Sequence, residues 1–219
     1  KTVVPMIASQ DHKRIFDGDK GPNTGGMGTY APAPVLTDAL RDEAMKTILE
    51  PMVAAMQKEG MPYVGCLYAG LMITSEGPKV VEFNARFGDP ETQVVLPLLD
   101  SDLGQIMMVC ATGNLTAEMV KWKDSSAACV ILASKGYPET SSKGDVIHGD
   151  IKQHDTTIVF HSGTKLVGEE YVTNGGRVLG VVGLGKDLRT ALDRAYGRIE
   201  HINFEGMQYR TDIGAKAFK

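Results

Sequence analysis

Residues 80–86 read Val80-Val-Glu-Phe-Asn-Ala-Arg86, and apolar and polar side chains largely alternate along them. Alternation with a period of two is typical of a β-strand that buries one of its faces. A strand is therefore predicted over Lys79–Asn84, and the segment Tyr63–Ile73 before it also has a strand-like composition. Thr74-Ser-Glu-Gly-Pro78 between them is typical of a turn, so the two strands are expected to form an antiparallel hairpin.

The polar face of the second strand carries residues that suit metal and anion binding. Glu82, Asn84 and Arg86 share that face, and successive Cα atoms on one face lie roughly 6–7 Å apart. A carboxylate and an amide oxygen at this spacing can reach one hard cation, and the adjacent guanidinium can bind an anionic oxygen. The alternative is a plain polar face on a half-exposed strand. The next residues, Phe87-Gly-Asp-Pro-Glu91, add two acids and a turn, and this charge density favours a functional site.

The other elements indicate an α+β chain with two regions. Helices are predicted over Asp38–Glu59, Glu91–Leu99, Asp102–Ala111 and Leu188–His201, and strands over 1–9, Ala127–Ala133, Ile158–Phe160 and Arg177–Leu184. The first helix repeats apolar residues every fourth position, at Leu40, Ala44, Ile48, Met52 and Met56, and Pro51 is expected to kink it. A polar stretch near Trp122–Ser126 predicts a domain boundary between residues 1–123 and residues 124–219.

Composition excludes several classes of protein. The 219 residues are 42% hydrophobic and 23% charged, which excludes disorder, collagen and a disulfide-stapled miniprotein. A net charge of −4 shows no bulk basic character of the kind that nucleic-acid binding favours. The three cysteines form no CxxC motif and are interpreted as small buried side chains in a reducing cytosol. With no membrane-span or signal-peptide pattern, the chain is expected to be soluble and cytoplasmic.

Two glycine-rich segments and a polar cluster are further candidate sites. Gly21-Pro-Asn-Thr-Gly-Gly-Met-Gly28 can present backbone N–H groups to an anion, but matches neither a P-loop nor a dinucleotide fingerprint. The segment Gln10-Asp-His-Lys-Arg14 shortly before it adds two cations and favours an anionic ligand. The alternative interpretation, an exposed turn whose charges bind nothing, is left open. Thr173-Asn-Gly-Gly-Arg177 either binds phosphate or closes a hairpin turn.

These motifs together resemble a known enzyme family. The segments Gln10–Arg14, Gly21–Gly28, Tyr68-Ala-Gly-Leu-Met72, Val81–Glu91, Thr173–Leu179 and Tyr209-Arg-Thr-Asp-Ile-Gly214 are similar, in order and over effectively the whole chain, to the glycinamide ribonucleotide synthetases (phosphoribosylamine–glycine ligases). This family belongs to the ATP-grasp superfamily. The resemblance implies that residues 1–123 are the C-terminal portion of an ATP-grasp domain and residues 124–219 a small α+β C-terminal domain.

The resemblance also implies an activity in purine biosynthesis. ATP would phosphorylate the glycine carboxylate, and the amine of 5-phosphoribosylamine would attack the resulting glycyl phosphate, giving glycinamide ribonucleotide, ADP and phosphate. The cofactors implied are ATP and Mg²⁺ or Mn²⁺, with Glu82 and Asn84 as metal ligands. Arg86 and Lys13 are the implied catalytic residues. The substrate and nucleotide-phosphate side is assigned Gln10, Asp11, His12, Asn23, Thr24, Gly25, Gly26, Met27, Asp89, Asn174, Gly175, Gly176 and Arg177.

The chain departs from the family pattern in two ways. Leu67–Ile73 holds none of the acidic metal ligands that many ATP-grasp enzymes carry there, a gap typical of this subfamily. The chain also opens inside an apolar run without Met, which is interpreted as a truncation, with the N-terminal half of the enzyme as a possible partner. The isolated chain is therefore expected to be inactive. Another ATP-grasp carboxylate–amine ligase, or a non-catalytic fragment that binds Mg²⁺ and phosphate, remains an alternative.

Overall fold

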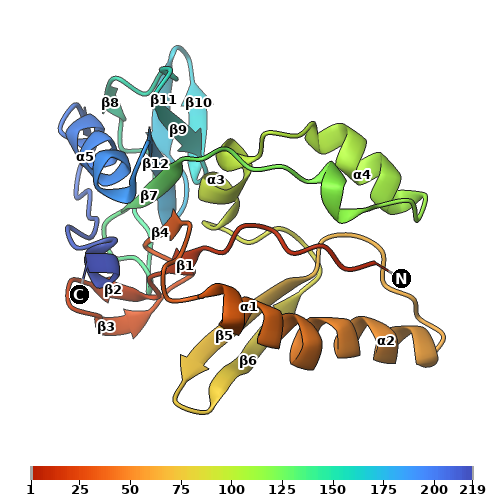
Figure 1. Ribbon diagram of the computed structural model, residues 1–219. Helices are drawn as coiled ribbons and strands as arrows, with labels where there is room; N and C mark the ends of the chain where they lie inside the picture. Colours follow the sequence, from red (N-terminus) through yellow and green to blue (C-terminus); the bar gives the residue numbers. More distant parts are fainter. Residues whose placement is uncertain (1, 219) are drawn as a thin grey trace. The chain divides into compact units, whose positions relative to one another are not determined.

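The computed structural model describes residues 2–218, and these form two compact units. One contains residues 2–8, 33–88 and 99–123 and is called the hairpin unit below. The other contains residues 9–32, 89–98 and 124–218 and is called the sheet unit. Figure 1 gives the labels of the helices and strands of both units.

The sheet unit is built on five antiparallel strands in the order β1-β4-β7-β12-β9. Their bounds are β1 Gln10–Asp11, β4 Gly28–Ala31, β7 Ser126–Ala133, β9 Thr157–His161 and β12 Arg177–Gly185. Strand β7 lies at the centre and all eight of its residues are buried. A strand buried on both faces has a continuous apolar sequence, as Ala127–Ala133 does.

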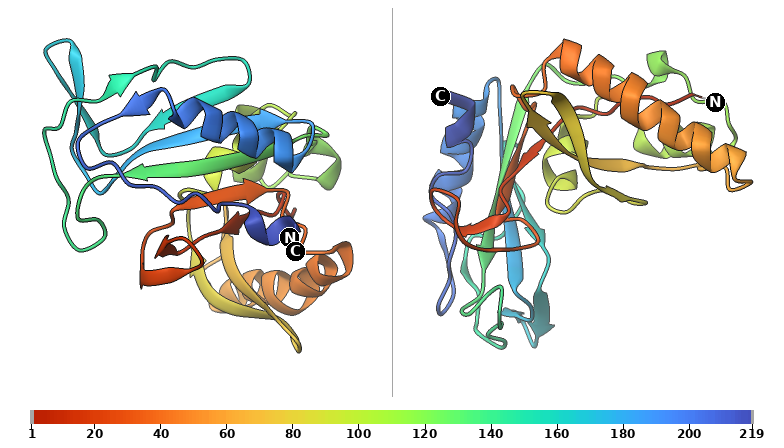
Figure 2. Two further views of the ribbon diagram at one scale, coloured as in Figure 1. Left: turned by 90° about the vertical axis from the view of Figure 1, so that its left-hand side faces the viewer. Right: turned by 90° about the horizontal axis from the view of Figure 1, so that it is seen from below.

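Helices cover both faces of this sheet. Helix α5 (Leu188–Ile199) packs against β7 and β12, and Figure 2 shows it lying along one face. Short helix α3 (Thr92–Val95), continued by the turn η2 (Leu96–Leu98), contacts β4, β7 and β12 from the other face (Figure 1). Gly183 permits the close approach of α5, because a Cβ there would lie 2.0 Å from the Ala191 carbonyl oxygen.

Two small hairpins, a further two-stranded pair and a terminal turn complete the sheet unit. The paired strands are β2 (Arg14–Phe16) with β3 (Lys20–Asn23), β10 (Thr164–Val167) with β11 (Glu170–Thr173), and β8 (His148–Gly149) with β13 (Ile202–Asn203). The final turn, η4, spans Ala215–Phe218. Hairpin β2–β3 leads into the glycine loop described below, and β11 leads into the turn before β12.

The hairpin unit combines one long irregular helix with the predicted hairpin. Its helical path runs through α1 (Asp38–Ala44), the π-helical segment η1 (Met45–Leu49) and α2 (Glu50–Lys58). Thr37 caps its start, and the π-helical segment ends just before Pro51, which cannot donate a backbone hydrogen bond. The predicted helix over Asp38–Glu59 is confirmed in this form, and the kink expected at Pro51 stays a prediction. Strands β5 (Tyr68–Thr74) and β6 (Gly77–Asn84) form the hairpin, followed by α4 (Leu103–Ala111) and the turn η3 (Ala117–Met119).

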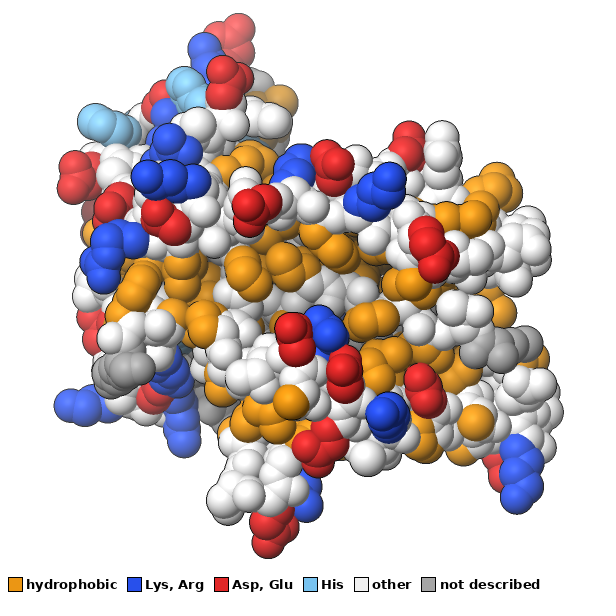
Figure 3. Space-filling view, in the orientation of Figure 1, with side chains coloured by type: hydrophobic (Ala, Val, Ile, Leu, Met, Phe, Trp, Pro, Cys, Tyr) orange, Lys and Arg blue, Asp and Glu red, His pale blue; other side chains and the backbone are white. Residues whose placement is uncertain are grey.

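The hairpin unit buries few apolar side chains. Among its described residues, the buried hydrophobic ones are Ala33, Ala44 and Leu99. Met107 and Met108 on α4 are 53% and 64% exposed, and Figure 3 shows hydrophobic side chains at the surface over this helix. The apolar core of the described structure is therefore concentrated in the sheet unit.

Most predicted elements are confirmed, but one predicted strand is wrong, and the strand-like segment Tyr63–Ile73 forms a strand only from Tyr68 onward. Residues 2–9 form no strand, residue 1 lies outside the described residues, and the first strand is Gln10–Asp11. Pro5 within that apolar run cannot donate to a strand ladder, which explains the error. Helix α4 begins at Leu103 and is capped by Asp102, whose carboxylate accepts from the Gln105 N–H. The α+β class is confirmed.

The compact units interleave along the sequence. Residue 124 begins a sheet-unit segment, as the predicted boundary places it, but segments 9–32 and 89–98 also pack in the sheet unit. The reason is hydrogen bonding: β4 pairs with β7, so Thr29 lies opposite Cys129. The division into sequence domains at 123/124 stays a prediction. None of the helices in the described part of the chain has the length and apolar character needed to span a bilayer.

Candidate functional site

The glycine loop between β3 and β4 is folded against neighbouring segments of the sheet unit. Thr24 anchors it, because its N–H and Oγ1 both donate to the Lys13 carbonyl, at 2.7 and 2.9 Å. The Thr24 hydroxyl oxygen also accepts from the Gly26 N–H at 2.9 Å. Gly26 has φ +124°, and a Cβ there would lie 2.5 Å from Pro90 Cδ and 2.7 Å from Asp11 Oδ1. Only glycine fits this position without a shift of its neighbours.

Arg177 connects the glycine loop to the segment that follows Gly88. From the start of β12 its Nη1 donates to the carbonyls of Gly25 (3.1 Å) and Asp89 (2.9 Å). Its Nη2 forms an ion pair with the Asp89 carboxylate at 2.9 Å. The other Asp89 oxygen accepts from Gln93 Nε2 at 2.7 Å. The predicted residues Gly25, Asp89 and Arg177, which are far apart in sequence, therefore meet in one polar cluster.

A buried carboxylate lies at the edge of the same loop. Asp11 sits on β1, its Oδ1 accepts from the His12 N–H at 2.7 Å, and its Oδ2 pairs with the Lys13 ammonium. Burial raises the pKa of Asp11 from 3.8 to about 6, and the nearby carboxylate of Glu91 adds to the rise, while Lys13 opposes it. Glu91 is itself 6% exposed. Such a carboxyl group can exchange a proton near neutral pH, which is a property of many functional sites.

His12 is built into the protein interior. It is 1% exposed, its Nδ1 contacts the Gly28 carbonyl at 3.1 Å, and its Nε2 accepts from the Gly214 N–H at 3.4 Å. This arrangement requires the neutral ring with the proton on Nδ1. Burial lowers the pKa of His12 from 6.5 to about 4, which is consistent with a neutral side chain. In this structure the side chain assigned to the substrate side contacts its own protein on both ring nitrogens.

The other predicted residues of the sheet unit hold the loops in place. The Gln10 side chain accepts a hydrogen bond from the Tyr30 hydroxyl, and Asn23 pairs with Arg14 at the end of hairpin β2–β3. Met27 is fully buried in a small cluster with Ile15 and Ala133. These contacts support the loop from within.

The turn before β12 is similarly held. The Asn174 N–H donates to the Gly163 carbonyl at 2.7 Å. The carbonyls of Gly175 and Gly176 accept from Ser134, at 3.0 Å from its hydroxyl and 2.8 Å from its N–H. Gly176 also lies against the ring of Tyr137, since a Cβ there would lie 2.2 Å from it.

Sequence reasoning missed Tyr137 and Gln93. The Tyr137 hydroxyl accepts from the Gly25 N–H at 3.0 Å, and its ring packs against Gly176, so it links both glycine segments. Gln93 orients Asp89. Tyr137 stands in the turn Lys135-Gly-Tyr-Pro138, whose composition marks a loop and is the one signal that pointed to it.

Strand β6 of the hairpin unit places two of the three predicted polar residues, Glu82 and Asn84, on one face as expected. Glu82 and Asn84 share a face of β6, since Asn84 Nδ2 donates to Glu82 Oε1 at 3.1 Å. A register shift opposite Gly70 and Leu71 leaves Val81 as an extra residue in β6. The strand ends at Asn84, so Arg86 lies beyond it instead of on its face, and its Nη1 donates to the Phe87 carbonyl at 3.0 Å. The expectation that Arg86 shares the polar face of the strand with Glu82 and Asn84 is wrong.

The donor set of this strand suits a hard cation. One carboxylate and one amide oxygen are ligands that Mg²⁺ accepts, and Mg²⁺ usually completes its shell with waters and substrate phosphates. In the described residues no three His, Cys, Asp or Glu side chains come together in a metal-binding group. A cation on Glu82 and Asn84 would thus depend on ligands from outside this pair.

Comparisons with known proteins agree with these features. Residues 1–92 match the family model described as "Phosphoribosylglycinamide synthetase, ATP-grasp (A) domain", and residues 127–216 match the corresponding "C domain". A phosphoribosylamine–glycine ligase from Caulobacter vibrioides is 53% identical over 100% of this chain and 52% of its own length. A trifunctional purine biosynthetic protein, adenosine-3, from Gallus gallus is 51% identical over 99% of this chain and 22% of its own length.

Solved structures give the same result. The crystal structure of phosphoribosylamine–glycine ligase from Thermotoga maritima has a TM-score of 0.85 and 34% identity, covering 96% of this chain and 52% of that one. The biotin carboxylase subunit of pyruvate carboxylase, at 14% identity and a TM-score of 0.63, shares the fold alone, over 91% of this chain and 42% of that one. This chain spans about half the length of the single-function ligases it matches. It belongs to the phosphoribosylglycinamide synthetase family, within the ATP-grasp fold.

Proposed function

We propose that this chain is part of an ATP-dependent carbon–nitrogen ligase that joins glycine to 5-phosphoribosylamine in purine biosynthesis. The observation that carries the proposal is the match of two successive domain models of one ligase family to residues 1–92 and 127–216. The cluster of Gly25, Asp89 and Arg177 supports it independently, because it offers a cation and a glycine loop beside each other. We assign the reaction to the cytoplasm, where free thiols such as those of this chain persist.

The proposed reaction has two steps. A glycine carboxylate oxygen attacks the γ-phosphorus of ATP, which breaks the bond to ADP and forms glycyl phosphate. The nitrogen of phosphoribosylamine then attacks the acyl carbon, the carbon–oxygen bond to phosphate breaks, and the amine loses one proton. Both steps gather negative charge on phosphate oxygens, so cationic groups at those oxygens lower the barrier.

The residues divide between these tasks. Glu82 and Asn84 would hold Mg²⁺ or Mn²⁺, which neutralises charge on the ATP phosphates when bound. Arg86 would bind the acyl phosphate, for which a planar guanidinium suits two oxygens at once. In the sheet unit, Arg177, Lys13 and the loop Thr24–Gly26 would bind the phosphoribosylamine side. Asp11, whose pKa is raised to about 6, is the carboxyl group able to take the amine proton near neutral pH.

A hybrid ligase tests the proposal. The hybrid joins this chain to the half of the Caulobacter vibrioides relative that this chain does not match. The hybrid should release ADP and phosphate only when glycine and phosphoribosylamine are both present, and the isolated chain should release neither. A folded hybrid that ignores glycine and uses another carboxylate would instead establish a different ATP-grasp ligase. Steady turnover by the isolated chain would overturn the expected inactivity.

A further inference from the structure

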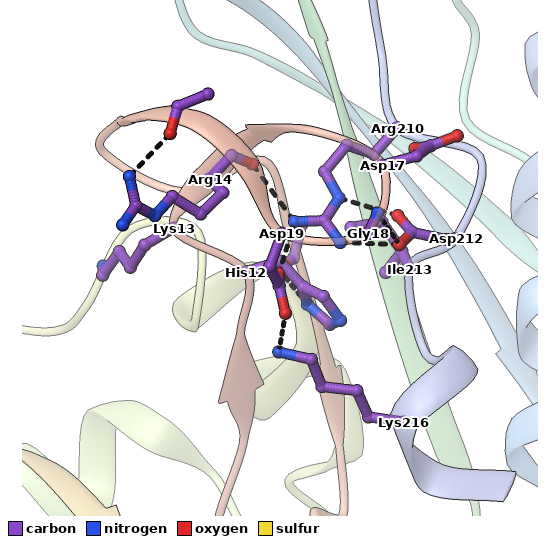
Figure 4. Close-up of polar contacts among 12 residues, drawn as sticks. His12, Lys13, Arg14, Asp17, Gly18, Asp19, Arg210, Asp212, Ile213 and Lys216 are labelled. Atoms are coloured by element: carbon purple, nitrogen blue, oxygen red, sulfur yellow. Dashed lines mark hydrogen bonds and ion pairs between the residues drawn. The ribbon is translucent and has the colours of Figure 1, made fainter. Parts of the chain in front are cut away.

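The sheet unit buries an arginine that sequence reasoning left without a role. Arg210 is 1% exposed and belongs to the C-terminal segment, residues 209–216. Its side chain contacts hairpin β2–β3. Its Nε and Nη2 donate to the two carboxylate oxygens of Asp212, at 2.7 and 2.8 Å. Its Nη1 donates to Asp19 Oδ1 at 2.9 Å and to the Arg14 carbonyl at 3.1 Å (Figure 4). One guanidinium therefore holds two carboxylates and one backbone oxygen.

The turn of hairpin β2–β3 is tied to the same C-terminal segment at three successive residues. The Asp17 carboxylate accepts from the N–H and hydroxyl of Thr211, and the Gly18 N–H donates to Asp212 Oδ2 at 2.9 Å. Asp19 pairs with Arg210 and also with Lys216, whose Nζ lies 2.5 Å from its other oxygen. The Lys216 ammonium lowers the pKa of Asp19, and Arg210 adds to this against the opposing effect of burial.

These contacts fix a turn that is strained on its own. Asp19 has φ +54°, a left-handed conformation that costs a non-glycine residue free energy unless its surroundings stabilise it. Two cations on its carboxylate supply that stabilisation. The turn conformation therefore depends on residues about 190 positions later in the sequence.

The contacts of Arg210 with hairpin β2–β3 are linked to the candidate site through Arg14. The Arg14 carbonyl that Arg210 binds belongs to the residue directly after Lys13. The Lys13 carbonyl accepts both bonds from Thr24, and Thr24 in turn accepts from Gly26. An unbroken series of backbone and hydrogen-bond links thus runs from Arg210 to the glycine loop that Arg177 contacts.

We infer that Arg210 is a positioning residue, which fixes hairpin β2–β3 so that Lys13 and the loop Thr24–Gly26 stay in place for the phosphoribosylamine substrate. The role in catalysis rests on the proposed function. The mechanical link, by which Arg210 holds Lys13–Gly26 in place, does not. A point charge cannot bind both oxygens of Asp212 and reach Arg14 as well, so lysine should replace this arginine only in part.

The test compares Arg210→Met and Arg210→Lys with Arg198→Met in the hybrid ligase. Arg198 is a matched control, since it lies in the same unit, its side chain is 9% exposed, and it pairs with Asp150 at 2.5 Å. Arg210→Met should raise KM for phosphoribosylamine about ten- to a hundredfold, because small misplacements of binding groups have effects of this size. KM for ATP should stay near the parent value, and Arg210→Lys should recover part of the loss.

Hydrogen exchange of the isolated chain separates this inference from the proposed function. Peptides covering Lys13–Gly26 should exchange faster in Arg210→Met than in Arg198→Met at equal global stability. If the parent hybrid is inactive but this difference is seen, the proposed function fails and the mechanical link stands. Unchanged exchange over Lys13–Gly26, or equal increases in KM for all substrates in both methionine variants, would overturn the inference. Arg210→Lys serves both measurements if the methionine variant does not fold.

Discussion

Two adjacent buried groups, Asp11 and His12, should oppose each other in the dependence of stability on pH. Burial raises the pKa of Asp11 from 3.8 to about 6, so the folded protein binds this proton more tightly than the unfolded chain does. Stability from Asp11 therefore rises as the pH falls from about 6 to 4, by about 3 kcal/mol. Burial lowers the pKa of His12 from 6.5 to about 4, so its contribution is lost over nearly the same interval, also by about 3 kcal/mol.

Replacing Asp11 by Asn should expose the histidine effect. Asn keeps an oxygen that can accept the His12 N–H bonded to Oδ1 in the parent, but it does not titrate. The parent should show nearly constant stability between pH 6.5 and 4, because the two contributions cancel. Asp11→Asn should lose about 3 kcal/mol over this interval. Asp187→Asn is the control: the pKa of this helix-capping carboxyl is lowered by hydrogen bonds to Thr190, so it titrates at lower pH and the profile should stay flat.

Urea unfolding at a series of pH values provides the measurement. Near-UV circular dichroism of the tyrosines reports on the sheet unit, since five of the seven tyrosines lie there. The single tryptophan, Trp122, belongs to the hairpin unit and gives a separate signal. The reasoning is refuted if Asp11→Asn keeps the flat profile, or if the parent already loses about 3 kcal/mol between pH 6.5 and 4.

Three further substitutions test the site. Gly26→Ala should lower the free energy of unfolding by about 1–3 kcal/mol, because φ is +124° there and a Cβ has no room. Thermal unfolding measures this change. The control is Gly197→Ala, which has open space at its Cβ and should not be destabilising. Arg177→Lys in the hybrid ligase should raise KM for phosphoribosylamine, because an ammonium cannot bind the Asp89 carboxylate and two carbonyls at once; an unchanged KM would contradict the role. Glu82→Gln should increase the Mg²⁺ concentration needed for half-maximal turnover, and normal activity at limiting Mg²⁺ would exclude Glu82 as a ligand.

The elements that sequence reasoning found are those whose pattern is local. The hairpin β5–β6 has alternation on one strand and a turn between the two, and the helical path from Asp38 shows apolar residues at four-residue spacing. The missed hairpin β10–β11 lacks such a signal, because its Leu166 and Val167 are apolar yet more than half exposed. An apolar segment alone does not indicate which face is buried.

The interleaving of the units could not be read from the sequence. It depends on pairing between β4 and β7, and nothing local to Gly28–Ala31 specifies a partner near residue 129. For the site, motif resemblance brought together Gly25, Asp89 and Arg177, which the structure places in contact. It could not distinguish His12, whose side chain is buried, from its neighbour Lys13, whose side chain is 46% exposed. Exposure is decided by long-range packing, here by the segment at Gly214.

The pairing of Thr29 with Cys129 also sets an order of events during synthesis on the ribosome. Strands β1 and β4 leave the exit tunnel before β7, which follows about 100 residues later, and β12, the other neighbour of β7, follows later still. At about 5–20 residues per second, β4 waits roughly 5 to 20 seconds for its partner. A nascent chain stalled before Ser126 carries the glycine loop and an edge of β4 whose partner β7 has not yet been made. The loop that contacts Arg177 therefore acquires its shape only after most of the polypeptide has been made.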